Sequence, residues 1–163
     1  MLQDEALRFI RLGTFLERAD NTARILEVKY LNLLPGSDEE MQSADYYQWS
    51  ALLRSVSAFE VYRRVYRDQI NPLRVAELLI LRADMPRSLA RCMKEVYSNL
   101  ARVANSRSAE TERLAGELEA HLHFGRIEGI FEGGMRKYLE DFRDRIFDLG
   151  CRISDDFLIP ANA

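Results

Sequence analysis

The feature that most constrains the fold is a stretch, residues 9–33, in which apolar residues recur at alternating spacings of three and four. The members of this stripe are Phe9, Leu12, Leu16, Ala19, Ala23, Leu26, Tyr30 and Leu33. Such spacing places every member on one side of an α-helix, which must bury that side against neighbouring helices. A similar stripe from Leu139 to Phe157 predicts a second long helix near the end of the chain.

The segments between these two stripes also follow a helical period, and no stretch alternates in the manner of a strand. We expect the first helix to run from about Asp4 to Leu34 and to end at Pro35-Gly36-Ser37. Further helices are expected from the capping box Ser37–Glu40 or from Ser43 to Tyr66, from Asn71 to Leu81, from the segment Asp84–Ser88 to Val103, from Ala109 to Phe124, and from Met135 onward. The sequence therefore predicts one all-α domain, residues 1–163, an up-and-down bundle of five to six helices with one short buried helix.

Composition and charge narrow the class of protein. Hydrophobic residues make up 47% of the chain and charged residues 30%, which is typical of a globular protein. The net charge of -3 gives no general reason to bind nucleic acid or an anionic membrane. Cys92 and Cys151 show no metal-binding spacing, so we expect reduced core residues. Because no signal-peptide pattern and no membrane-length apolar run is present, we expect a cytoplasmic protein.

No residue pattern predicts a catalytic, metal or cofactor site. The two histidines, His121 and His123, cannot share a helical face, whereas a metal-binding bundle would show Glu-x-x-His on two helices. Glu117 and His121 do share a face, and we expect a solvent-exposed pair there. The glycines in 129–134 lack a phosphate-loop pattern and predict a turn between helices. Three arginines in 63–67 predict a solvated helix face rather than a nucleic-acid site.

Two charged residues of the first helix need a separate explanation. Glu17 and Arg24 lie on the stripe beside the apolar one, and that stripe is apolar at both ends. We therefore expect a second neighbour to cover them, and a covered charge needs a partner. The two side chains are about 10 Å apart along the axis, too far to pair directly. We hypothesise that Glu17 accepts hydrogen bonds from Arg54 or Arg87.

Two interpretations of this network remain open. It is either an internal clamp that sets helix register, with Ser55 or Ser88 nearby, or a cleft in which arginines bind an anionic substrate. We favour the clamp, because structural ion-pair networks also concentrate charge. The position of Arg87 supports such a network. A positive side chain in the first turn of a helix interacts unfavourably with the helix dipole, so another interaction should hold it there. An enzyme would use Glu17 as a base, but nearby arginines would weaken it in that role.

Three segments resemble, in the same order, the bacterial alpha-E domain family. They are the run from Leu7 to Leu26 that contains Glu17-Arg18, the run from Trp49 to Arg63, and the run from Pro86 to Cys92. The resemblance implies a helical domain whose family-motif or anion-binding residues are Glu17, Arg18, Arg24, Arg54, Arg87 and Ser88. It covers most of the chain but corresponds to the C-terminal half of the usual, longer family protein. The chain departs from the family pattern at Arg82, where an acidic residue is expected.

The resemblance implies a function through the proteins that accompany the family. Alpha-E proteins tend to be encoded with, or fused to, circularly permuted ATP-grasp proteins and transglutaminase-like proteins. We therefore expect a helical partner or scaffold without catalysis of its own, which contacts an ATP-grasp-type ligase or a transglutaminase-like protein in amide or peptide bond formation or processing. The alternative is an enzyme or small-ligand binder that uses Glu17 and nearby arginines on a carboxylate or phosphate. A homo-oligomer also remains open.

Overall fold

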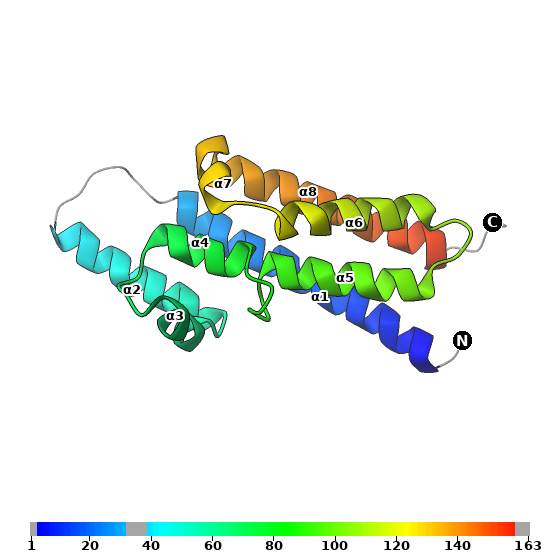
Figure 1. Ribbon diagram of the computed structural model, residues 1–163, viewed down its shortest axis with the longest axis horizontal. Coiled ribbons are helices and arrows are strands. Elements are labelled where there is room, and N and C mark those ends of the chain that lie inside the picture. Colours follow the sequence, from blue (N-terminus) through cyan, green and yellow to red (C-terminus); the bar gives the residue numbers. More distant parts are fainter. Residues whose placement is uncertain (1–2, 32–38, 159–163) are drawn as a thin grey trace.

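The computed structural model describes residues 3–31 and 39–158, and every regular element within those ranges is helical (Figure 1). The elements are α1 (Gln3–Leu31), α2 (Glu39–Ser55), α3 (Phe59–Tyr66), α4 (Pro72–Ile80), α5 (Leu89–Val103), α6 (Ala109–His123), α7 (Ile127–Gly133), α8 (Met135–Ile153) and the π-helical turn η1 (Ser154–Leu158). The all-α prediction is confirmed. The predicted helix stop at 35–37 and the Ser37 cap lie outside the described residues.

Four helices, α1, α5, α6 and α8, form the body of the fold (Figure 1). Helix α1 packs against α5 and α8, and α6 packs against the same two helices from the other side. Successive members of this bundle run in opposite directions, as the short turn between α5 and α6 requires. Helices α2, α3, α4 and α7 gather at one end of the molecule.

The apolar stripe of α1 forms part of the core, as its spacing predicts. Leu12, Ala19, Ala23 and Leu26 are at most 1% exposed. On the last long helix, α8, buried residues include Leu139 and Leu149, again as predicted. Because one stripe from each helix meets the others, the helices enclose a continuous apolar interior.

The single helix predicted up to Tyr66 is wrong, because the chain breaks between α2 and α3. Ser57 adopts a left-handed backbone conformation with φ of 56°. The amide of Ala58 then donates to the carbonyl of Leu53 at 2.7 Å, which closes the turn. Ala58 is fully buried. Tertiary packing therefore overrides the helical period, and α3 begins at Phe59 in a new direction.

Local signals set the boundaries of α4 correctly, whereas the turn predicted for 129–134 is wrong. The side chain of Asn71 accepts from the amide of Leu73 at 2.8 Å and caps the buried α4. Residues 127–133 instead form α7, because Ile127 and Ile130 are buried. The described residues hold eight α-helices rather than the five to six predicted, and these two differences account for the excess.

Candidate functional site

The structure places Glu17 at the surface, so the predicted internal clamp is wrong. Its side chain is exposed and makes no hydrogen bond or ion pair with any part of the chain that the structure describes. Neither Arg54 nor Arg87 forms an ion pair with it. Helix α8 does lie beside α1, but its Arg143 binds Asp20 and Glu27 rather than Glu17.

The charges that join α1 to α8 are those of Asp20, Glu27 and Arg143. The Nη1 of Arg143 donates to Glu27 at 2.6 Å, and its Nε donates to Asp20 at 3.3 Å. Arg24, predicted to need a partner, finds it in Asp20, to which its Nε donates at 2.6 Å. The sequence holds a signal for this network, because Asp20 and Glu27 each follow a buried stripe residue. Charges that flank an apolar seam commonly form interhelical pairs.

Three of the predicted site residues, Arg18, Arg87 and Ser88, meet at the junction of α1 and α5. The Arg18 guanidinium lies over the Phe15 ring, 5.1 Å from its centroid. Burial raises the pKa of Cys92 to about 12, although the nearby charges of Arg18 and Arg87 act in the opposite direction. Because a thiol with so high a pKa stays protonated, Cys92 is not suited to act as a nucleophile.

Ser88 has a structural role at this junction. Its hydroxyl accepts from the amide of Arg91 at 3.0 Å and so caps α5. The same hydroxyl donates to the carbonyl of Arg82 at 2.6 Å. Thr22 of α1 donates to the carbonyl of Arg87 at 2.9 Å and ties the two helices together. Arg82, where the chain departs from the family pattern, binds the neighbouring Asp84.

Arg54 lies apart from the other predicted site residues. Its guanidinium carbon is 4.0 Å from the centroid of the Phe59 ring at the start of α3. The six residues singled out by the sequence therefore occupy three places: Glu17 and Arg24 beside α8, Arg18, Arg87 and Ser88 beside α5, and Arg54 at the end of α2.

A groove of about 580 Å³ runs between α1 and α8, beside Glu17. Its lining residues are Leu16, Glu17, Asp20, Arg24, Arg143, Asp144, Ile146, Phe147, Gly150, Cys151 and Ser154. The Phe147 side chain is 75% exposed. Cys151 is a free, exposed thiol, so its predicted place in the core is wrong. We call this feature the α1–α8 groove.

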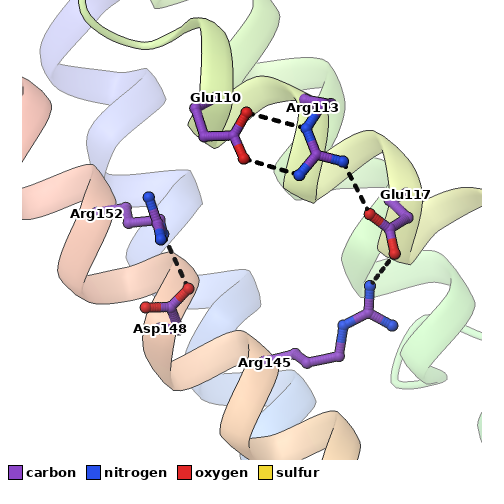
Figure 2. Close-up of polar contacts among 6 residues, drawn as sticks. All are labelled: Glu110, Arg113, Glu117, Arg145, Asp148 and Arg152. Atoms are coloured by element: carbon purple, nitrogen blue, oxygen red, sulfur yellow. Dashed lines mark hydrogen bonds and ion pairs between the residues drawn. The ribbon is translucent and has the colours of Figure 1, made fainter.

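The predicted Glu117–His121 pair takes a different form, because the Glu117 carboxylate binds arginines instead (Figure 2). Arg113 donates to it at 3.1 Å and Arg145 of α8 donates at 2.8 Å. His121 contacts only the backbone carbonyl of Glu117, at 2.8 Å. Of these contacts, the one between Arg145 and Glu117 links α6 to α8. Within residues 3–31 and 39–158, no cluster of three or more His, Cys, Asp or Glu side chains is placed to hold a metal ion.

In the described part of the chain, no helix has both the length and the hydropathy needed to cross a membrane.

Comparisons with known proteins identify the family. Neither the curated proteins nor the solved structures give a match to the chain. Residues 1–158 match Alpha-E, described as a predicted alpha-helical domain with a conserved ER motif. The chain contains two such dipeptides, Glu17-Arg18 and Glu112-Arg113. Because the match spans nearly the whole chain, the protein belongs to the Alpha-E family.

Proposed function

We propose that the protein is a non-catalytic helical partner in an ATP-grasp-linked system that forms or processes amide or peptide bonds. The class of partner, an ATP-grasp-type ligase or a transglutaminase-like protein, comes from the family resemblance. The observation that carries a docking role is the open α1–α8 groove with an unpaired Glu17 at its edge. We propose that this groove receives a helix of the partner protein.

Two glycines inside helices support close approach by another backbone. On α1, Gly13, Glu17, Asp20 and Arg24 are spaced by four, three and four, so Gly13 lies on the same face of the helix, one turn before the groove residue Glu17. Gly150 lines the opposite wall. A Cβ atom at either glycine would meet no neighbouring group within 4 Å. A glycine inside a helix costs roughly 0.5–1 kcal/mol relative to alanine, and packing within the described chain does not require either one.

Exposed apolar side chains continue along the same pair of helices. Phe147 projects from α8 into the groove and is 75% exposed. The rings of Phe9 and Phe157 are 5.3 Å apart and place the first part of α1 beside η1, which follows α8. Next to them along the chain, Ile10 and Leu158 are 65% and 64% exposed. Single exposed apolar residues are ordinary, but several along one helix pair are typical of an interaction surface.

The charge of the groove favours a basic partner. Glu17 on α1 and Asp144 on α8 form no ion pair within the described residues. The groove arginines, Arg24 and Arg143, are already bound by carboxylates. The uncompensated charge is therefore negative. A second copy of this chain would bring like charges together, so the occupant that fits is an amphipathic helix of another protein, with small residues facing the glycines and Arg or Lys at its flanks.

The alternative function is an enzyme or ligand binder that uses Glu17 with nearby arginines, and the geometry supports it less well. Such a site needs arginines that are free to bind substrate beside Glu17. The nearest ones are engaged, and Arg54 and Arg87 lie elsewhere. This alternative predicts that a small carboxylate or phosphate stabilises the isolated chain and that Arg87→Ala abolishes the effect.

Co-expression with the neighbouring ATP-grasp-type or transglutaminase-like protein tests the proposed function. We expect the two proteins to purify as a complex in which Cys151, at the groove, reacts more slowly with a maleimide than in the free chain. Cys92 is fully buried and does not contribute to the signal. We further expect Gly150→Leu to weaken the complex, because a side chain there occupies the space that the partner needs.

The matched control is Gly129→Leu in α7. Like Gly150, Gly129 is a helical glycine with no neighbour near its Cβ position, but it is exposed and lies outside the groove. Failure to form a complex with either candidate partner would overturn the partner role. A complex in which Cys151 stays fully reactive and Gly150→Leu has no effect would keep the partner role and exclude the groove.

A further inference from the structure

A second pocket lies at the other end of the molecule, where α3 leads into the loop before α4. Its volume is about 630 Å³. It is lined by Tyr46, Phe59, Arg63, Arg67, Asp68, Gln69 and Ile70. We call it the α3 pocket. It shares no lining residue with the α1–α8 groove.

The surface around the α3 pocket carries several arginines without ionic partners. Arg54, Arg63, Arg64 and Arg67 are all exposed, and none forms an ion pair within residues 3–31 and 39–158. By contrast, Arg113 binds two carboxylates on the outer face of α6 (Figure 2). On a protein with a net charge of -3, this local excess of positive charge attracts anions.

Two of these arginines make cation–π contacts with the Phe59 ring. The guanidinium carbons of Arg54 and Arg63 lie 4.0 and 5.9 Å from the centroid of the same ring. The two charges are therefore at most 9.9 Å apart, and no carboxylate in the described residues binds either one. Like charges at such a distance repel, and a bound anion would turn that repulsion into attraction. Arg67 follows in a left-handed conformation, with φ of 52°, and completes the basic wall.

The carboxylate that lines the pocket does not neutralise these arginines. Asp68 accepts from the backbone amide of Gln69 at 2.7 Å and from the Nη1 of Arg74 at 2.8 Å. Those hydrogen bonds hold the pKa of Asp68 below its usual range. Since Asp68 is engaged with Arg74, the charges of Arg63 and Arg67 remain available to a ligand.

A buried tyrosine holds in place the loop that forms one wall of the pocket. The hydroxyl of Tyr62, which is fully buried, donates to the carbonyl of Gln69 at 3.1 Å and accepts from the amide of Asn71 at 2.9 Å. These bonds fix the loop against α3, so ligand binding does not have to order that wall of the pocket.

We propose that the α3 pocket binds a small molecule that carries a multivalent oxyanion, either a phosphate group or several carboxylates. Arg63 and Arg67 contact the oxyanion, because the planar guanidinium fork matches phosphate and carboxylate geometry. Arg54 adds positive charge from its position on the Phe59 ring. Phe59 and Ile70 receive an apolar part of the ligand. The pocket lies apart from the docking surface, so its ligand is independent of the proposed function.

Calorimetric titration of the full chain with pyrophosphate and, separately, with citrate tests this site at constant ionic strength. We expect saturable binding of at least one of the two anions, and the comparison shows whether phosphate or carboxylate is preferred. Arg63→Gln and Arg67→Gln should each weaken the affinity about tenfold, the value of one charge-assisted hydrogen bond. Arg63→Lys keeps the charge but loses the fork, so it should fall between wild type and Arg63→Gln.

The control is Arg126→Gln, which makes the same change in net charge at an exposed arginine outside the pocket. Thermal unfolding of each variant verifies that it is folded at the temperature of the titration. If neither anion binds saturably, the site is excluded. The proposal also fails if Arg126→Gln weakens binding as much as Arg63→Gln, because binding would then depend on net charge alone.

Discussion

Alanine at Gly150 should stabilise the isolated protein, although the same position belongs to the proposed docking surface. Gly150 lies inside α8, and a Cβ there meets no neighbouring group within 4 Å. Alanine therefore adds helix propensity and restricts the unfolded chain without a clash. The expected gain is roughly 0.5–1 kcal/mol in the free energy of unfolding. Gly13 of α1 has the same open surroundings, and the same gain is expected there.

Two other glycines provide contrasts within the same protein. A Cβ at Gly116 would lie 3.1 Å from Cε2 of Tyr97, a ring that is 41% exposed and can move, so we expect little net change. A Cβ at Gly125 would lie 2.8 Å from the backbone carbonyl oxygen of His121. Because backbone cannot give way easily, Gly125→Ala should destabilise the protein by about 1–3 kcal/mol.

Urea unfolding followed by circular dichroism measures this series. For a chain of this length, about 1 kcal/mol corresponds to roughly 2–4 °C in the unfolding midpoint, so heating scans give a second readout. The expected order of stability places Gly150→Ala and Gly13→Ala above wild type and Gly125→Ala below it. If the first two variants were less stable than wild type, the open space at these glycines would be disproved. The two glycines would then give no support to docking at the α1–α8 groove.

Two further predictions concern the bundle itself. Arg143→Met removes both ion pairs to α1 and leaves Glu27, whose side chain is 15% exposed, without a partner. We expect the free energy of unfolding, measured with urea, to fall by about 1–2 kcal/mol. An unchanged midpoint would show that these ion pairs contribute nothing to stability. Burial raises the pKa of Cys92 from 9.0 to about 12. As the pH rises, the thiol therefore ionises in the unfolded chain before it ionises in the folded protein. The contribution of the Cys92 thiol to the free energy of unfolding is complete below pH 9 and is lost between pH 9 and 12. Cys92→Ala should reduce the alkaline loss of stability.

Several features of the fold follow from interactions between residues close in sequence. The stripe of α1 was predictable because a spacing of three and four places residues on one helical face whatever the partner. The start of α4 was predictable for a similar reason, since the capping side chain of Asn71 binds an amide two residues away. The same period does not guarantee burial, since Tyr97 of α5 follows it and is 41% exposed.

The errors arise where distant residues override local preference. The break at Ser57 occurs in a sequence with a continuous helical period, because packing of Ala58 and Tyr62 stabilises a left-handed residue there. The α7 helix forms in a glycine-containing segment because burial of Ile127 and Ile130 offsets its weak propensity. Neither effect is visible from residues four positions apart.

The sequence by itself determined the all-helical class, the apolar faces of the long helices, the start of α4 and the family, because each depends on local spacing or on an ordered motif. Only the tertiary structure decided which charges meet. Glu17 and Asp20 are three residues apart on one helix, yet α8 brings Arg143 to Asp20 and leaves Glu17 open at the groove. That outcome depends on the rotation of one packed helix about its axis relative to another. A rotation of this kind is set by the whole core, and the pattern of a single helix does not contain it.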